Sequence, residues 1–268
     1  MSIEKMIASL SNEKIKDAVA IKNNHGRYRN DAFFIEGTRL FTTALDAGVA
    51  IQRVFFTYEF ALKDANAPVI ERLNKLGLTL DEVSPMVMEK LSDTQTPQGI
   101  AGIGARKNFS LVDIDAAANP QIVICDGMKD PGNLGAIIRT AEAFATDTIV
   151  ILPNTSNPYA PKAIRASAGG IFNLAVVYAT AKQELASWLK DRGIRLIVTV
   201  PEGGMDIRDI DMASPFAVVL GSEAVGASPD IIKMADVTAS IPMRGITGSL
   251  NAAAAAAVFL YESFRKRH

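Results

Sequence analysis

The sequence is poor in the residues that build disulfide frameworks and metal sites. Its 268 residues contain one cysteine, Cys125, and two histidines, His25 and His268. A single cysteine excludes a disulfide within the chain and a CxxC metal site, and two histidines cannot form a histidine-rich cluster. We therefore expect no metal centre and no structural disulfide, and a reducing, cytoplasmic setting.

Long apolar runs and a strong net charge are also missing. The longest apolar run, residues 252–261, is too short for a membrane helix of about 18 residues or more, and no N-terminal run is typical of a signal peptide. The formal net charge of −1 gives no overall basic signal for nucleic acid. With 49% hydrophobic and 21% charged residues, the composition indicates a globular protein of one or two domains without a membrane partner.

Three common active-site motifs are absent as well. No G-x-G-x-x-G opens a helix after a strand, which disfavours a nucleotide-binding oxidoreductase, and no GxxxxGK[ST] phosphate loop occurs. No GxSxG elbow occurs, and the histidines are badly placed for a Ser-His-Asp triad. The chemistry must therefore depend on other residues.

What the sequence does contain is an alternation of strand-like and helix-like runs, which predicts an α/β fold. Strands are predicted at residues 33–36, 52–57, 78–83, 100–105, 121–125, 148–152, 174–178, 195–200, 216–220 and 238–241. Helices are predicted at residues 13–22, 37–47, 67–76, 85–91, 134–144, 161–168, 182–192, 230–233 and 249–265. Because strand 216–220 is apolar at every position, we expect a parallel sheet covered by helices on both faces.

The alternation is interrupted once, at residues 107–120, which have no clear period and are predicted to connect two domains. The N-terminal domain then covers residues 1–106 and the C-terminal domain residues 121–268. The first 30 residues form a basic helical arm, which either exposes a solvated helix face or contacts RNA. Its cations are Lys14, Lys16, Lys22, Arg27 and Arg29.

Ligands of open parallel sheets bind beyond the carboxyl ends of the strands, so the loops that follow the C-terminal strands are the candidate site. The first loop, residues 126–133, leads into a helix that carries Arg139. Asn133 is either the N-cap of that helix or a functional residue. Arg139 either pairs with Glu142 three residues later or requires a ligand, because its helix is otherwise nearly all apolar.

The second loop, residues 221–229, carries Glu223, which either begins a helix or orients an arginine through a charge-assisted hydrogen bond. The third loop, residues 241–251, is glycine-containing and ends at Ser249 and Asn251. Ser249 alone would read as the N-cap of the alanine-rich last helix. Each loop is weak evidence when it is taken singly.

Together and in this order, the three loops resemble the SpoU/TrmH family of RNA 2′-O-ribose methyltransferases, within the SPOUT superfamily. The matching segments are DPGNLGAIIRTAEAF, APKAIRASAGGIFNLAVV, VVLGSEAVGAS and IPMRGITGSLNAAAAAA. The segments FFIEGTRLFTTALDAG and QRVFFT are similar to the L30e-like substrate-binding extension of the family, which would occupy residues 31–106. The resemblance implies a C-terminal domain threaded as a deep trefoil knot, one of the rare exceptions to unknotted topology.

The resemblance also implies S-adenosylmethionine as methyl donor and a homodimer formed through the C-terminal domain. The residues that match the catalytic positions of the family are Asn133, Arg139, Glu223, Ser249 and Asn251. Those that match its cofactor-binding positions are Leu220, Gly221, Ile241, Met243 and Leu250.

The predicted function is therefore S-adenosylmethionine-dependent 2′-O-methylation of RNA, most readily ribosomal RNA of the 23S type. A transfer-RNA methyltransferase and a non-catalytic RNA-binding or ribosome-assembly protein on the same fold stay open as alternatives. Because a guanidinium is effectively always protonated, we expect Arg139 to bind an RNA phosphate or the developing alkoxide, oriented by Glu223, and not to act as the base.

Overall fold

A computed structural model describes residues 6–24, 31–114, 119–246 and 248–268. The chain forms two compact units, and each is described by itself. One unit contains Met1–Lys107 and Tyr159–Arg165, and the other contains Asn108–Pro158 and Ala166–His268. The segment Tyr159–Arg165 therefore lies in the N-terminal unit, and not in the C-terminal domain predicted for residues 121–268.

The N-terminal unit is a mixed four-stranded sheet with helices around it. Its strands are β1 (Ala32–Glu36), β2 (Ile51–Phe56), β3 (Leu80–Glu82) and β4 (Ile100–Ala105). The sheet order is β1-β4-β2-β3, in which β4 is antiparallel to both of its neighbours and β2 is parallel to β3. Its helices are α1 (Glu13–Lys22), α2 (Thr38–Asp46), α3 (Tyr58–Ala61), η2 (Asp64–Asn66), α4 (Ala67–Lys75), α5 (Pro85–Leu91) and α7 (Pro161–Ala166), whose last residue belongs to the other unit.

Helix α1 shows how local sequence sets these elements. Asn12 caps it by accepting a hydrogen bond of 2.9 Å from the Lys14 amide, so the predicted start of the helix is confirmed. Ile15, Ala18 and Ile21, at a spacing of three, are buried and pack in a core with β1 and α5.

Two side chains explain why Tyr159–Arg165 belongs to the N-terminal unit. The Tyr159 ring lies 5.3 Å from the Phe33 ring. The Arg106 guanidinium lies 4.7 Å from the centre of the same Tyr159 ring, on its face. Arg165 forms an ion pair of 2.9 Å with Asp93. No periodicity in the sequence signals these contacts, because they join segments far apart in the chain.

The C-terminal unit is a seven-stranded sheet in which every pairing is parallel, as the all-apolar strands predict. Its strands are β5 (Gln121–Asp126), β6 (Thr148–Ile151), β7 (Ala175–Tyr178), β8 (Arg195–Thr199), β9 (Met205–Asp206), β10 (Phe216–Gly221) and β11 (Val237–Ser240). The sheet order is β7-β6-β5-β10-β8-β11-β9. Only the two-residue β9 has no predicted counterpart.

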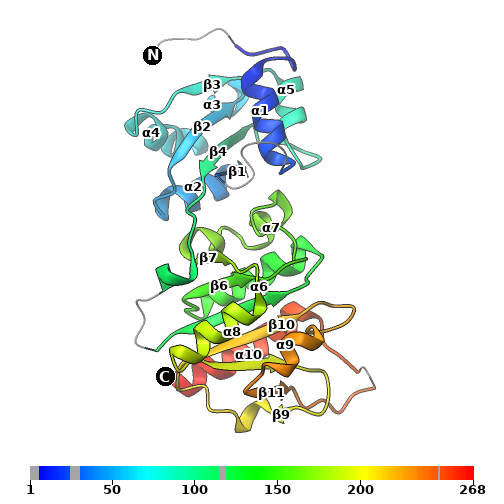
Figure 1. Ribbon diagram of the computed structural model, residues 1–268. Helices are drawn as coiled ribbons and strands as arrows, with labels where there is room; N and C mark the ends of the chain where they lie inside the picture. The colour runs from blue at the N-terminus through cyan, green and yellow to red at the C-terminus, as the bar shows by residue number, and fades with distance from the viewer. Residues whose placement is uncertain (1–5, 25–30, 115–118, 247) are drawn as a thin grey trace. The chain divides into compact units, whose positions relative to one another are not determined.

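Helices cover both faces of this sheet (Figure 1). Residues of α8 (Lys182–Asp191) and α9 (Pro229–Lys233) share one buried cluster with β5, β6, β8 and β10. Helices α6 (Pro131–Ala143) and α10 (Ala252–Arg267) pack against each other, and α10 contacts β10. The remaining short helices of the unit are η3 (Leu111–Ile114), η4 (Gly170–Asn173) and η5 (Ile207–Asp209).

The segment predicted as a connector is not a free linker. Phe109, Leu111 and Ile114 pack against the buried cluster of the C-terminal unit, and Phe109 forms a parallel bridge with Val177. These apolar side chains are irregularly spaced, so the sequence shows no period there. Their packing against the cluster nevertheless holds residues 109–114 on the sheet. No helix within the described ranges is long and apolar enough to cross a membrane. The trefoil knot stays a prediction.

Candidate functional site

The topology brings the first two candidate loops to one edge of the sheet. Strands β5 and β10 are parallel neighbours, and Gly221 lies opposite Asp126 in their register. Both loops therefore begin at the same level, where β5 and β10 end. This is the edge at which ligands bind in open parallel sheets.

A chain of hydrogen bonds joins all three loops. Asn133 Nδ2 on α6 donates to Glu223 Oε1 at 2.7 Å, and Asn251 Nδ2 donates to Asn133 Oδ1 at 3.1 Å. We call these three side chains the Asn–Glu–Asn cluster. Its members lie up to 118 residues apart in the chain, so only folding assembles them.

The side chain of Asn133 is available for this cluster because another residue caps its helix. Asp130 is the N-cap of α6 and accepts from the Gly132 amide at 3.0 Å, while Pro131 occupies the first helical position. Helix α6 therefore begins three residues earlier than predicted. The interpretation of Asn133 as an N-cap is wrong.

The cap predicted for the last helix is also wrong. Helix α10 begins at Ala252, and its N-cap is Asn251, whose side chain accepts from the Ala253 amide at 2.9 Å. Asn251 thus uses its Oδ1 for the helix and its Nδ2 for Asn133. Ser249 lies in the preceding loop, free of any capping role.

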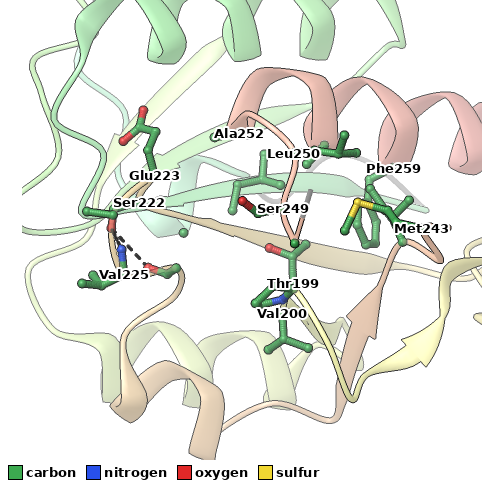
Figure 2. Close-up of a pocket in the computed structure, with 18 residues that line it drawn as sticks. Thr199, Val200, Ser222, Glu223, Val225, Met243, Ser249, Leu250, Ala252 and Phe259 are labelled. Atoms are coloured by element: carbon green, nitrogen blue, oxygen red, sulfur yellow. Dashed lines mark hydrogen bonds between the residues drawn. The ribbon is translucent and has the colours of Figure 1, made fainter. Parts of the chain in front are cut away.

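A pocket of about 420 Å³ is lined by the second and third loops, by the end of β10, by residues 199–201 at the end of β8 and by α10. Its lining includes all five predicted cofactor-binding residues, together with Glu223 and Ser249. In Figure 2, Ser222, Glu223 and Val225 lie on one side of it, Met243 and Phe259 on the other, and Ser249 and Leu250 between them. The volume and the mixture of apolar side chains with loop backbone are typical of small-molecule sites.

The loop that closes one side of the pocket requires glycine at position 221. Ser222 and Gly226 exchange backbone hydrogen bonds of 3.0 and 2.9 Å, which fold the loop back onto the end of β10. A Cβ at Gly221 would lie 2.0 Å from both the Ala227 nitrogen and the Gly226 carbonyl carbon. No side chain fits there, so the glycine is required by close approach of the backbone.

Arg139 is not part of the Asn–Glu–Asn cluster. It lies six residues after Asn133 on α6, so the two side chains project about 120° apart around the helix. It is exposed, and it makes no hydrogen bond or ion pair with any residue that the structure describes. Glu223, expected to orient Arg139, is exposed and bonds to Asn133 instead.

Sequence reasoning missed a buried ion pair behind the loop. The Asp126 carboxylate, 4% exposed, lies 3.2 Å from Lys182 Nζ and accepts from the Ser228 amide at 2.8 Å. Lys182 also donates to the Ser228 hydroxyl at 2.5 Å. These bonds anchor the end of the loop that lines the pocket. A charged residue ending an otherwise apolar strand, as in VICD, was the available signal.

Burial beside Asp126 also sets the chemistry of the cysteine. Cys125 is completely buried, and desolvation, with a smaller contribution from the Asp126 charge, raises the pKa of its thiol to about 12. The side chain is therefore a neutral packing residue and no nucleophile.

The predicted RNA-binding arm has internal partners. Lys14 forms an ion pair of 2.6 Å with the buried Asp81, and Lys22 donates to the Lys90 and Ser92 carbonyls at 3.0 Å. Desolvation lowers the pKa of Lys22. Among the residues that the structure describes, Lys16 pairs only with the exposed Glu13. Arg27 and Arg29 lie outside the described residues, and an RNA-binding role for the arm stays a prediction.

Comparison with known proteins places this geometry in a family. The model of the SpoU rRNA methylase family matches residues 120–261, which contain all three loops. The chain belongs to the SpoU rRNA methylase family. Residues 12–102 match a second model, the MRM3-like substrate-binding domain. The family expected from the three motifs is therefore confirmed.

Members of the SpoU family resemble the chain over nearly its whole length. It is 28% identical over 260 residues to the 23S rRNA (guanosine(2553)-2′-O)-methyltransferase RlmP of Bacillus subtilis, covering 96% of this chain and 98% of that protein. It is 28% identical to the 23S rRNA (uridine(2479)-2′-O)-methyltransferase of Streptomyces viridochromogenes, covering 91% and 86%. The AdoMet-bound rRNA methyltransferase from Sinorhizobium meliloti superposes with a TM-score of 0.85 at 29% identity, covering 97% of each chain.

Proposed function

We propose that this protein transfers a methyl group from S-adenosylmethionine to a ribose 2′-hydroxyl of ribosomal RNA. The observation that carries the proposal is the Asn–Glu–Asn cluster, which joins three family motifs beside a pocket of small-molecule size. Family membership supplies the reaction class, and the cluster supplies polar groups at the place where that reaction would occur.

The pocket fits the methyl donor in its chemistry. Its apolar side chains, Met243, Leu250 and Phe259 among them, suit an adenine ring, and the backbone at Leu220, Gly221 and Ile241 supplies polar groups. The crystal structure of the rRNA methyltransferase from Sinorhizobium meliloti, which is 29% identical to this chain, contains bound AdoMet. When bound, S-adenosylmethionine supplies an activated methyl group on its sulfonium sulfur.

The side chains of the chain itself would position the ribose and stabilise its charge. In this proposal Asn251 holds Asn133 and Asn133 holds Glu223, so that the second carboxylate oxygen of Glu223 is presented to the ribose, while Ser249 lies at the pocket wall. Arg139 supplies a fixed positive charge for an RNA phosphate or the developing alkoxide. A phosphate or a water then accepts the hydroxyl proton, because a guanidinium cannot.

Ribosomal RNA is the preferred substrate because relatives named for it match both units. The similarity to RlmP covers 96% of the chain, and the N-terminal unit matches a substrate-binding domain. The two relatives are named for a guanosine and a uridine, so the base of the target nucleotide does not carry over. The expected cytoplasmic location agrees with this substrate and stays a prediction.

We also propose that the protein is a homodimer through the C-terminal unit. Helix α10 exposes apolar side chains at every third position, with Val258 39%, Tyr261 56% and Phe264 38% exposed. Phe144 extends this surface, its ring lying 6.0 Å from Tyr261 and 5.8 Å from Phe264. Large adjoining apolar side chains are typical of interaction sites. Tyr261→Glu is expected to shift the sedimentation of the protein from dimer to monomer.

The direct test compares 2′-O-methylation maps of ribosomal RNA from a deletion strain and its parent. A single missing mark, restored by the wild-type gene but not by Glu223→Gln, is the expected outcome. Unchanged ribosomal RNA together with a missing mark in transfer RNA would overturn the substrate assignment. Maps that agree throughout, in a strain with a ribosome-assembly defect, would favour a non-catalytic role.

A further inference from the structure

One family-like segment contributes nothing to the pocket or the cluster. APKAIRASAGGIFNLAVV ends in η4 and β7, and Asn173 is the last residue of η4. We infer that Asn173 is a positioning residue that holds the Glu142 carboxylate and so keeps the Arg139 guanidinium unpaired for its anionic substrate. This inference rests on the proposed function of Arg139.

Arg139 and Glu142 have a spacing at which opposite charges commonly pair on a helix. Two such pairs form elsewhere in the described part of the chain, Glu13 with Lys16 at 2.8 Å and Glu262 with Arg265 at 2.7 Å. Arg139 and Glu142 do not form one. Instead, Glu142 Oε1 accepts a hydrogen bond of 3.1 Å from Asn173 Nδ2.

The charge order makes this diversion possible. In both of the pairs that form, the acid precedes the base along the helix, which is the favourable order, whereas Arg139 precedes Glu142. The competing ion pair is therefore weak, and one hydrogen bond suffices to hold the carboxylate elsewhere. An amide does so without adding a second cation beside Arg139.

The packing of η4 against α6 places Asn173 beside Glu142. Gly169, with a φ of +88°, turns the chain into η4. A Cβ at Gly170 would lie 3.3 Å from Glu142 Cβ and 3.6 Å from Arg139 Cα. The backbone of η4 thus lies directly against the turn of α6 that carries both charged residues.

Freedom from Glu142 matters because of what Arg139 is proposed to bind. A carboxylate paired with the guanidinium would occupy part of its donor fork and repel an approaching phosphate. Asn173 therefore acts on the substrate only through Glu142 and Arg139. Removing Asn173 is expected to harm the reaction only while the Glu142 charge is present.

The test is a set of four full-length proteins: wild type, Asn173→Ala, Glu142→Gln and the double variant. Each methylates ribosomal RNA from the deletion strain with radiolabelled S-adenosylmethionine in single turnover. Asn173→Ala should react about two- to fivefold more slowly at low salt, the size of an exposed ion-pair effect, and the defect should shrink as salt rises. Glu142→Gln and the double variant should match wild type.

The rate of the double variant shows whether Asn173 positions Glu142 or only attaches η4 to α6. If Asn173 only attached η4 to α6, removal of the Glu142 charge would not restore the rate. A double variant as slow as Asn173→Ala, or an Asn173→Ala protein as fast as wild type, would overturn the inference and leave the proposed function intact. Asn74→Ala on α4, an exposed asparagine in the other unit, is the matched control. A wild-type protein that binds S-adenosylhomocysteine but methylates no RNA would overturn both.

Discussion

Asn133 and Glu223, 90 residues apart in the chain, are joined by a hydrogen bond of 2.7 Å between Asn133 Nδ2 and Glu223 Oε1. The bond links the first and second motifs at the edge of the parallel sheet, and Asn251 extends it to the third. It exists because Asp130, and not Asn133, caps α6.

Glu223→Gln should lower the rate of methyl transfer about a hundredfold, because a neutral amide no longer holds Asn133 by a charge-assisted bond. Binding of S-adenosylhomocysteine, measured by calorimetry, should change by less than about threefold, since the pocket shape is kept. Glu184→Gln, at an exposed position of α8, is the matched control. Full activity of Glu223→Gln would remove the cluster from the mechanism.

Gly221→Ala should abolish the pocket while leaving most of the fold. The added Cβ would lie 2.0 Å from backbone atoms of Gly226 and Ala227, so the loop must move away from β10. We expect at least about tenfold weaker binding of S-adenosylhomocysteine and a lower melting temperature. Gly248→Ala, where a Cβ meets no atom within 4 Å, should keep the wild-type melting temperature. Equal melting temperatures for both variants would contradict this account.

Asp126→Ala should destabilise the C-terminal unit by about 2 kcal/mol, because it leaves the Lys182 ammonium, 21% exposed, without its carboxylate. Urea unfolding measures this loss. The double variant Asp126→Ala with Lys182→Met should recover part of it, since no unpaired charge remains. A double variant whose loss equals the sum of the losses of Asp126→Ala and Lys182→Met would show that the pair does not act as a unit.

Lys14→Ala should lower the free energy of unfolding by about 1 kcal/mol, because Lys14 compensates the buried Asp81 together with Arg53. Lys16→Ala should change it by less than about 0.5 kcal/mol, since Lys16 and its partner Glu13 are both exposed. Thermal melts of the two variants measure these losses of stability. If Lys14→Ala weakens RNA binding at unchanged stability, the arm binds RNA through Lys14 after all.

Alkaline pH should destabilise the fold through Cys125. Its pKa is raised by burial to about 12, so the folded thiol keeps its proton while the unfolded thiol loses it. The contribution of Cys125 to the free energy of unfolding is fully present below the pKa of the unfolded thiol. Between about pH 9 and pH 12 it falls by about 1.4 kcal/mol for each pH unit. Unfolding curves of wild type and Cys125→Ala should therefore diverge in this window. Parallel curves would contradict the shift.

The helices and strands were largely predictable because their causes are local. Strand 216–220 is apolar at every position and lies at the centre of the sheet, and the helix at 13–22 begins at a capping asparagine. The errors lie where two local signals compete. Asn133 and Ser249 are good capping residues, but Asp130 and Asn251 take those positions, and nothing in the short-range pattern ranks one cap above the other.

The family, the α/β class and the three loops could be read from the amino-acid sequence, because ordered motifs and apolar periodicity are properties of neighbouring residues. Tertiary structure alone decided that Asn133, Glu223 and Asn251 meet, that Asp126 and Lys182 anchor the pocket loop, and that Asn173 holds Glu142. It also placed Tyr159–Arg165 in the N-terminal unit. Each of these joins residues from separate elements, and only the strand order and the packing of the helices bring those elements together.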